Sequence, residues 1–559
     1  YEITCRDWSS DVCSSDLRIN RAGQNPQANI RKAATAIPGS SKFLIGIYYD
    51  GRIIPVGRKC ASPHAKLAGA PGAAMIATFS VTAAVSLAAL IVVMLARAAA
   101  TRPAPEPGEL DRSLLEPYAG VEEKLAAFIR IPTVSRFDAA EEDEEAFSRI
   151  RGEALRLFPL ARDRLLRPDA GDRAMLFEWP GSDASLPPVI LTAHYDVVPP
   201  GDESLWTKPP FSGDVADGFV HGRGAQDVKV MMICALEAAE RLLAAGFVPR
   251  RTVFLAFGGD EETGGHRGAA AIAAVLRERG VRASFLLDEG GFVASGMLRF
   301  ADRPLALVGV AEKGYVDVAI HASGSGGHAS MPPRHTAAGI VSKAVALSEA
   351  NPFPARITAT LARFLDDLSP YAPFAYKLLF RNLFVTAPLV KAAFSASPAT
   401  NALVRTTTAA TMMSASDKEN VLPDRARAVL NVRVLPGGDV AGTMSRLERI
   451  AARAGARAEF AHHGHAVEPL PESPVDHEGY RAIEACVRRV FPEAGTVPFM
   501  FTAGTDTKHY LDVAEAIYRF EPVMQSEDDL SGVHGANEKL SVDNARRCCM
   551  FYETLMRTL

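Results

Sequence analysis

Side chains that can bind metal ions occur where apolar, β-type runs of this sequence end. His194 and the acidic run 260–262 close two such runs, and Asp227 lies where a loop gives way to another apolar segment. Zinc binds neutral imidazole nitrogen and carboxylate oxygen, and two zinc ions about 3.5–4 Å apart can hold a water as a nucleophile near neutral pH. These residue types therefore indicate a two-metal hydrolytic site, if the fold brings them together.

The elements around these residues alternate between strands and helices. Short apolar runs at 189–193, 252–257 and 283–287 predict strands, and the Ala- and Leu-rich segments 228–247 and 268–279 predict helices. Such alternation is typical of a parallel sheet, which binds ligands outside the carboxyl ends of its strands. We therefore expect an α/β catalytic domain whose metal-binding side chains share one edge of a parallel sheet.

The composition is that of a large globular protein. The chain has 559 residues, of which 48% are apolar and 23% charged, so it can bury a core and form several domains. Its formal net charge is −4, and Lys and Arg are scattered, so no nucleic-acid partner is expected. The 7 cysteines show no CxxC pair, so they predict neither a cysteine zinc site nor a disulfide framework.

An uncharged apolar segment runs from Ala73 to Ala96. At about 1.5 Å per residue, a helix of this length exceeds a hydrocarbon core of about 30 Å. We predict a transmembrane signal anchor that places the catalytic domain on the extracytoplasmic side of the membrane. A signal peptide cleaved after residues 98–100 is the alternative, and it would give an exported or periplasmic protein. The Pro-rich linker 97–110 argues against a buried core helix.

Residues 1–72 carry little periodic pattern. Their opening resembles translated sequencing adapter more than protein. This N-terminal extension is therefore doubtful, and we expect it to be an artefact with Met75 as a candidate start of the native chain.

A second domain is expected between residues 305 and 468. Apolar residues alternate at 316–320, as in a strand with one buried face, and a glycine-rich segment containing His328 follows. That segment lacks the GK[ST] sequence of a phosphate loop, so nucleotide binding is not predicted. The Phe-, Leu- and Pro-rich stretch 350–408 is expected to form core or interface, or to receive an apolar substrate group.

The catalytic domain is then expected in two parts. The first covers residues 111–304 and the second covers residues 469–559, which return to the same sheet after the second domain. A strand at 497–502 and a terminal helix at 542–556 are predicted in the second part.

As a set, the strand-end motifs resemble those of the dinuclear zinc aminoacylase and carboxypeptidase family, which includes carboxypeptidase G2 and aminoacylase-1. The motifs are HxD at 194–196, GRGxxDxK at 222–229, DEE at 260–262 and DEGG at 288–291. The resemblance covers most of the chain from the Pro-rich linker onward, and it is closest to the carboxypeptidase S branch, which also contains N-acyl-amino-acid synthase/hydrolases. It implies that the second domain is an inserted α+β lid of the dimerisation type, and so a homodimer.

The resemblance also implies two Zn2+ per subunit, with Co2+ or Mn2+ as substitutes. Asp227 would bridge both ions, and the other ligands would divide between them. Family members differ over which acid of the adjacent pair 288–289 is used, so Glu289 is an alternative to Asp288. The implied ligands are, in chain order, His194, Asp227, Glu262, Asp288 and His534.

Three further residues are implied to take part in catalysis. Glu261 would be the general base that takes a proton from the metal-held water and passes it to the leaving amine. Asp196 would orient the His194 imidazole by accepting its other N–H. His328 would polarise the scissile carbonyl or stabilise the oxyanion, after lid closure or from a partner subunit.

Four other residues are expected to bind the substrate. Asn420 and Arg433 resemble positions that bind a substrate carboxylate, Arg433 through a bidentate pair. Gly504 and Thr505 belong to a segment that resembles the family's glycine-rich substrate loop.

These assignments predict a zinc-dependent hydrolase that cleaves an amide bond next to an amino acid with a free carboxylate. The substrate would be a small peptide or an N-acyl amino acid, and the same site could run as a synthase. The second candidate is an N-acetyl-amino-acid deacetylase or succinyl-diaminopimelate-type deacylase, against which the apolar N-terminal segment and the long insert argue. An inactive binding protein would be expected to lack a ligand, and none is missing.

Overall fold

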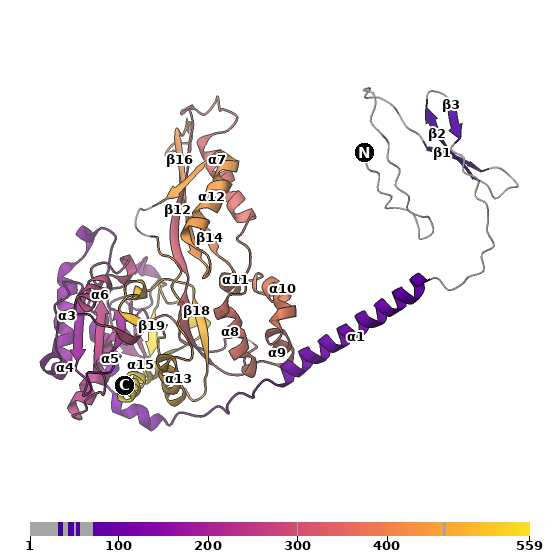
Figure 1. Cartoon of the computed structure of the whole chain (residues 1–559). Coiled ribbons are helices and arrows are strands. Elements are labelled where there is room, and N and C mark those ends of the chain that lie inside the picture. Colours follow the sequence, from indigo (N-terminus) through magenta and orange to yellow (C-terminus); the bar gives the residue numbers. More distant parts are fainter. Residues whose placement is uncertain (1–31, 37–42, 50–51, 56–70, 299, 462–465) are drawn as a thin grey trace. The chain divides into compact units, whose positions relative to one another are not determined.

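The computed structural model describes residues 32–36, 43–49, 52–55, 71–298, 300–461 and 466–559 (Figure 1). Most of the doubtful extension 1–72 therefore lies outside the described residues. The chain divides into two compact units, Tyr1–Ser86 and Leu87–Leu559. The first unit contains a three-stranded antiparallel sheet and the start of helix α1, with the bounds β1 (Lys32–Ala36), β2 (Phe43–Tyr49), β3 (Arg52–Pro55) and α1 (Pro71–Ala99).

Helix α1 contains the predicted apolar segment. Among the described residues it is the one helix long and apolar enough to cross a membrane, and its stretch Thr78–Ala99 is exposed apart from Leu90, Met94 and Ala98. The same length and composition also suit a signal sequence. The predicted helix is confirmed, and it continues through the first residues of the predicted linker.

The unit Leu87–Leu559 is built around a nine-stranded sheet. Its strands run in the order β20-β10-β11-β19-β9-β5-β8-β4, and β18 pairs with β11. The central strands β8, β5, β9 and β19 are parallel, whereas β4 and β10 are antiparallel to their neighbours β8 and β11. The expected parallel sheet is thus the centre of a mixed sheet. Its strands are β4 (Ala174–Trp179), β5 (Val189–His194), β8 (Val253–Gly258), β9 (Ala283–Asp288), β10 (Val293–Ala294), β11 (Leu305–Glu312), β18 (Gly495–Phe501), β19 (Ala514–Arg519) and β20 (Met524–Gln525).

Helices cover both faces of this sheet. Leu191 and Leu287 pack with α2, α3, α4, α5, α13 and α15 on one face, while Ile190 and Leu286 pack with α6 on the other. Neighbouring strand residues point to opposite faces, so strands covered on both sides show continuous apolar runs instead of alternation. The helices are α2 (Val121–Ile129), α3 (Glu144–Leu157), α4 (Pro159–Arg164), α5 (Lys229–Ala244), α6 (Ala269–Glu278), α13 (Glu478–Val490) and α15 (Val542–Thr558).

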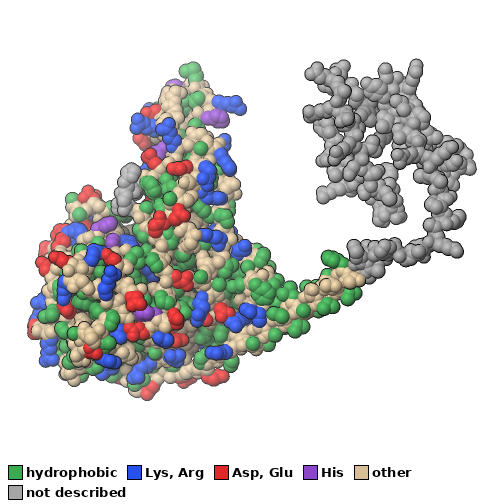
Figure 2. Space-filling model, viewed as in Figure 1, with side chains coloured by type: hydrophobic (Ala, Val, Ile, Leu, Met, Phe, Trp, Pro, Cys, Tyr) green, Lys and Arg blue, Asp and Glu red, His purple; other side chains and the backbone are tan. Residues whose placement is uncertain are grey.

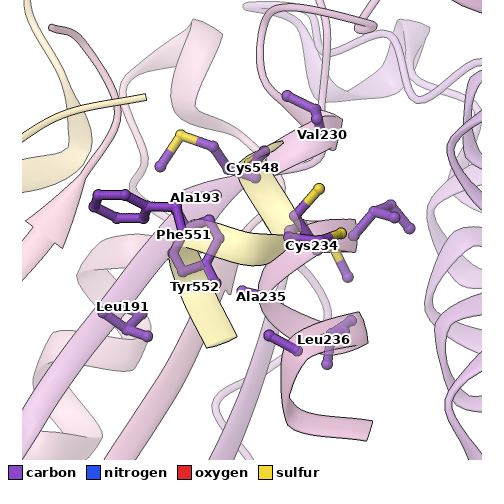
Figure 3. Packing of buried hydrophobic residues seen from close by; sticks show 14 of the residues in the cluster. Leu191, Ala193, Val230, Cys234, Ala235, Leu236, Cys548, Phe551 and Tyr552 are labelled. Atoms are coloured by element: carbon purple, nitrogen blue, oxygen red, sulfur yellow. The ribbon is translucent and has the colours of Figure 1, made fainter. Parts of the chain in front are cut away.

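Helix α5 is held between strand β5 and the C-terminal helix α15. Figure 3 shows Cys234 of α5 beside Cys548 of α15, with Leu191 of β5 in the same cluster. The Cys234 thiol also donates a hydrogen bond to the carbonyl of Ala545, at 3.3 Å. Because α5 begins at Lys229, two residues after Asp227, this packing fixes Asp227 near the carboxyl end of β5.

A second sheet is inserted between β11 and β18. It is antiparallel, with the strand order β14-β16-β12-β17, and α7 and α12 cover the face to which Val316, Val318 and Ile320 point. The alternation predicted at 316–320 is confirmed. Strand β11 belongs to the larger sheet, so this inserted sheet begins with β12 and not at residue 305. Its elements are β12 (Gly314–Ser323), α7 (Ala337–Ala350), β14 (Thr407–Ser414), β16 (Arg425–Val434), α12 (Val440–Ala454) and β17 (Arg457–Phe460).

The apolar stretch between α7 and β14 forms four helices, of which α8 packs on strand β18 of the larger sheet. Leu361 and Phe364 of α8 join a buried cluster with Leu305 of β11 and Val497 of β18. The aromatic rings of Phe364 and Phe499 also meet edge to face, with centroids 5.8 Å apart. The stretch is therefore core in large part. The four helices are α8 (Ala359–Leu368), α9 (Phe374–Phe380), α10 (Leu383–Phe394) and α11 (Pro398–Val404).

Two small sheets and a short helix complete the described fold. The strands β13 and β15 form a two-stranded ribbon, and β21, β7 and β6 form a three-stranded sheet. The bounds are β6 (Asp214–Ala216), β7 (Phe219–His221), β13 (Gly327–His328), β15 (Val421–Leu422), α14 (Glu527–Leu530) and β21 (Lys539–Ser541).

Candidate metal centre

Two groups of metal-binding side chains lie at the carboxyl edge of the larger sheet. The first is His194, Asp227 and Glu289, and the second is Asp227, Glu262 and His534; within each group the ligand atoms lie within 4.8 Å of one another. Asp227 belongs to both groups through different oxygens. Its Oδ1 lies 3.1 Å from His194 Nε2, and its Oδ2 lies 2.8 Å from His534 Nε2. A carboxylate placed in this way can bridge two metal ions.

The fold brings these residues together because parallel strands end at a common edge. His194 is the last residue of β5, Glu262 follows β8, and Glu289 follows β9. Asp227 precedes α5, and His534 comes from the loop between α14 and β21. Strand β21 pairs with β7, which lies shortly before Asp227 in the chain, so the two loop residues are also held close to each other.

Glu289, and not Asp288, lies in the first group of metal-binding side chains. Asp288 is the last residue of β9, in register with Arg519 of β19, and its buried side chain belongs to neither group of metal-binding side chains. Glu289 lies one residue beyond the end of β9, and its side chain reaches His194 at the carboxyl edge of the sheet. Its Oε1 lies 3.4 Å from His194 Nε2. In the described structure the first group therefore contains Glu289, the alternative that the sequence left open, and not Asp288.

The charges of the site fit divalent cations. Burial raises the pKa of Glu289 to about 7 and also raises the pKa of Glu262, while hydrogen bonds to Asp227 and Glu262 raise the pKa of His534 to about 10. Without a cation, burial thus favours the forms of Glu289 and Glu262 that carry protons, whereas hydrogen bonds from His194 and His534 outweigh burial and lower the pKa of Asp227. Metal ions bind the deprotonated ligands and would take the place of those protons. Two imidazoles and three carboxylates, one of them shared, are a donor set that suits two such ions.

Asp196 connects the His194 strand to the loop that carries Glu261. Its buried carboxylate accepts hydrogen bonds from the backbone N–H groups of Glu261 at 3.0 Å and Glu262 at 3.2 Å, and from the Ser135 hydroxyl at 2.7 Å. His194 Nδ1 lies 3.1 Å from the Asp196 carbonyl oxygen and 3.3 Å from its Oδ1. The imidazole is thereby oriented with Nε2 toward the metal-binding group, which is the arrangement expected from the sequence.

Glu261 faces the same cavity as the ligands but belongs to neither group. The cavity has a volume of about 1080 Å³, and Asp227, Glu262, Glu289 and His534 are among the residues that line it. Burial, together with the nearby Glu289 charge, raises the pKa of Glu261 well above its ordinary value. A carboxylate with a raised pKa beside a metal-binding group has the properties of a general base.

Comparison with known proteins agrees with this arrangement. Residues 190–558 match the model of peptidase family M20/M25/M40. The chain belongs to the M20 family. Members of this family are metal-dependent hydrolases, so the chain is an enzyme that acts on amide bonds.

The similar proteins lie in the predicted branch of the M20 family. The mouse N-fatty-acyl-amino acid synthase/hydrolase PM20D1 is 39% identical over 435 residues, which cover 77% of this chain and 86% of the mouse protein. Carboxypeptidase S of Saccharomyces cerevisiae is 31% identical over 470 residues, which cover 75% of this chain and 81% of the yeast protein. The prediction of the carboxypeptidase S branch is thereby confirmed.

Solved structures share the M20 fold at low sequence identity. The metallo-carboxypeptidase Sso-CP2 of Sulfolobus solfataricus has a TM-score of 0.58 and 18% identity, covering 78% of this chain and 98% of that one. Human carnosine dipeptidase 1 has a TM-score of 0.56 and 15% identity, covering 81% of this chain and 99% of that one. These likenesses establish the fold.

Half of the predicted substrate-binding residues line the cavity. Arg433 and Gly504 do so, and the Arg433 guanidinium lies 4.7 Å from the centroid of the Tyr315 ring. Thr505 is instead buried behind the wall, where its hydroxyl donates to Glu312 Oε2 at 2.9 Å. Asn420 is exposed and does not line the cavity.

His328 also lies outside the cavity in this structure. It is exposed on the β13–β15 ribbon, and its Nδ1 lies 2.8 Å from the Ser330 hydroxyl. Asn420 is close by, because its carbonyl oxygen accepts a hydrogen bond from the Ala329 N–H. The two residues predicted to act on the substrate from the second domain are therefore together, but they are separate from the metal-binding groups.

Glu538 supports the site and was not predicted. Its buried carboxylate accepts the Arg223 guanidinium at 2.6 Å and the backbone N–H groups of Gly224, Gln226 and Asp227 at 3.0, 2.7 and 3.2 Å. It therefore fixes the loop that presents the bridging carboxylate. The sequence holds no spacing signal for this role, because the partners lie on a segment more than 300 residues earlier.

We expect Glu538→Gln to weaken metal binding. The amide removes the negative charge that opposes Arg223 and turns an N–H group toward backbone donors, so the Asp227 loop loses its support. Loss of such an outer partner lowers metal affinity by about 10–100-fold. Metal titration followed by mass spectrometry measures this, with the exposed Glu527→Gln as the matched control. Equal metal affinity in the two variants would show that the loop is held by other contacts.

Proposed function

We propose that this chain is a zinc-dependent hydrolase that cleaves the amide bond of N-acyl amino acids. The observation that carries the proposal is the placement of the two Asp227 oxygens on two histidine-containing groups, with Glu261 beside them in the cavity. Similarity to an N-fatty-acyl-amino acid synthase/hydrolase supports the substrate class. Phe292, Phe501 and Leu511 give the same cavity apolar walls on which an acyl group could pack.

The ligands proposed for the two Zn2+ are those of the two groups. When bound, such a metal pair would lower the pKa of a water molecule and polarise the amide carbonyl. Glu261 would accept a proton from the attacking water and deliver it to the leaving amine nitrogen. Asp196 keeps His194 in the orientation that this chemistry needs.

Arg433 is proposed to bind the free carboxylate of the substrate. It lines the cavity, its ring contact with Tyr315 fixes the guanidinium plane, and a planar guanidinium can pair with a carboxylate through two hydrogen bonds. His328 and Asn420 are proposed to reach the substrate when the inserted sheet moves or when a second subunit supplies them. Such a requirement is consistent with a homodimer.

Helix α1 is proposed to anchor the chain in a membrane, with the catalytic domain on the extracytoplasmic side. Its uncovered apolar surface supports this proposal. Removal as a signal peptide would give an exported enzyme instead, and N-terminal sequencing of the native protein distinguishes the two.

A substrate panel tests the proposed activity. We expect hydrolysis of N-oleoyl amino acids to exceed that of N-acetyl amino acids and dipeptides, and a chelator to abolish it. Preference for dipeptides would favour a carboxypeptidase, which similarity to carboxypeptidase S supports as the second candidate. Preference for N-acetyl substrates would favour a deacetylase. Activity that survives chelation would contradict the metal mechanism.

We expect Arg433→Ala to raise KM for substrates with a free carboxylate. Hydrogen bonds to charged groups contribute about 1.5–3 kcal/mol, which corresponds to about a 10- to 100-fold loss in kcat/KM. The corresponding methyl ester, which lacks the carboxylate charge, should be hydrolysed equally by both forms. The matched control is Arg425→Ala, an exposed arginine on the same strand β16. An equal loss on acid and ester would place Arg433 in a structural role.

A further inference from the structure

Helix α10 exposes a face without a polar side chain. Its exposed residues recur at helical spacing along one side, while Thr386 and Val390 of the opposite side are buried. Surface hydrophobic residues are usually scattered, and a contiguous group marks a contact with something else. The exposed residues are Phe384, Val385, Pro388, Leu389, Ala392 and Ala393.

Helix α9 extends this apolar face. The consecutive residues 373–376, which include Phe374 and Tyr376, are exposed, and the Tyr376 ring stacks on Phe300 with centroids 4.8 Å apart. The two helices contain no acidic residue, and the charged side chains in and between them, Lys377, Arg381 and Lys391, are all basic. Arg381 is paired with Asp366 of α8, so the positive charge of this surface comes from Lys377 and Lys391. The surface formed by α9 and α10, residues 373–394, therefore combines exposed apolar and aromatic side chains with positive charge.

This α9–α10 surface is continuous with the end of α1. The Asn382 side-chain amide donates to the Met94 carbonyl at 3.1 Å, and Arg97 Nε donates to the Arg381 carbonyl at 2.9 Å. The Arg97 guanidinium also lies 5.5 Å from the centroid of the Phe384 ring. Figure 2 shows hydrophobic side chains gathered over these helices and along the adjoining part of α1.

One side of α1 packs against these helices, and the other sides remain uncovered. Between Leu87 and Ala99, only Leu90, Met94 and Ala98 are partly or fully buried, and they lie one turn apart. The uncovered apolar residues of α1 and those of α10 therefore form neighbouring parts of one apolar surface within the unit Leu87–Leu559.

We propose that the α9–α10 surface lies in the interfacial layer of a lipid bilayer, beside the point where α1 leaves that layer. Apolar side chains at this depth are buried among acyl chains, aromatic side chains favour the boundary, and basic side chains contact lipid phosphates. This inference concerns the attachment of the chain to a membrane and is separate from amide hydrolysis.

The α9–α10 surface and the cavity are connected through a shared buried layer of the protein. The buried cluster beneath α9 and α10 is packed against Phe292, which also lines the cavity. A membrane that contacts this surface would lie next to the protein layer that forms one wall of the site.

Quenching by lipids brominated in their acyl chains tests the proposal in the full chain. Single tryptophans are introduced as Leu389→Trp on α10, Val92→Trp on α1 and Val248→Trp on the catalytic domain; these positions are similarly exposed, at 58%, 63% and 56%. After reconstitution into phosphatidylcholine vesicles, the emission of the 3 native tryptophans is subtracted. We expect brominated lipid to remove most of the added emission of Leu389→Trp and Val92→Trp, and little of that of Val248→Trp.

Each other outcome overturns the proposal in a distinguishable way. Quenching of Val92→Trp alone would show that α1 inserts while the α9–α10 surface stays in water. No quenching at either position would also contradict the membrane anchor. Disulfide cross-linking of Leu389→Cys between two copies in vesicles, without quenching of Leu389→Trp, would assign the surface to a dimer interface. Amide hydrolysis of a soluble substrate by each variant shows that it is folded and tests the proposed function independently.

Discussion

Replacing Glu261 by Gln is expected to lower kcat by about 10³-fold, within the range that a general acid–base group contributes. Glutamine preserves the size of the side chain but cannot accept the proton of the attacking water or return it to the leaving amine. Glu261 belongs to neither metal-binding group, so the variant should still bind two metal ions. Steady-state kinetics on an N-acyl amino acid and metal analysis of the same samples measure the two effects.

The exposed Glu278→Gln on α6 is a matched control for this change, because it removes the same charge without touching the cavity. A Glu261→Gln enzyme that loses metal along with activity would show that this side chain is a ligand. One that keeps nearly full kcat would assign the proton transfer to another group.

Glu289→Gln is expected to remove one of the two metal ions and nearly all activity. Its Oε1 lies 3.4 Å from His194 Nε2, so the amide would replace a charged ligand of the first group by a weaker neutral one. The second group, which contains Glu262 and His534, does not include Glu289 and should retain its ion. Metal content per subunit and spectroscopy of the cobalt-substituted enzyme measure the change.

Asp288→Asn is the informative companion variant. Burial raises the pKa of Asp288 to about 6, and its Oδ2 has no hydrogen-bond partner in the described structure, so this acid is costly to ionise. Asp288 also belongs to neither metal-binding group. We expect the asparagine variant to keep both metal ions. Loss of an ion from Asp288→Asn, with retention in Glu289→Gln, would restore the assignment first expected from the sequence.

The sequence predicted the central part of the fold well. The strands β5, β8 and β9 and the helices α5 and α6 lie within a few residues of their expected bounds, because each is a continuous apolar run closed by glycines or acids. Parallel strands end at one edge, so this local information was sufficient to bring His194, Glu262 and Asp227 close together. His534 required the family resemblance, since nothing in its own surroundings indicates a strand end.

Features that depend on register or on distant partners could not be predicted. Whether Asp288 or Glu289 reaches the site depends on where β9 ends, and a shift of one residue moves a side chain to the other face. Glu538 contacts a loop that precedes it by more than 300 residues. The placement of β11 in the larger sheet likewise follows from its pairing with β18, which no local pattern reveals.

The dependence of the site on the last part of the chain has a consequence for biosynthesis. His534 belongs to the second metal-binding group, Glu538 fixes the loop that carries Asp227, and α15 packs on the helix that follows this loop. The ribosome must therefore add residues more than 300 positions after Asp227 before the two groups can come together. Metal uptake must follow the synthesis of these residues, and for an exported chain it would occur on the far side of the membrane, from the ions available there.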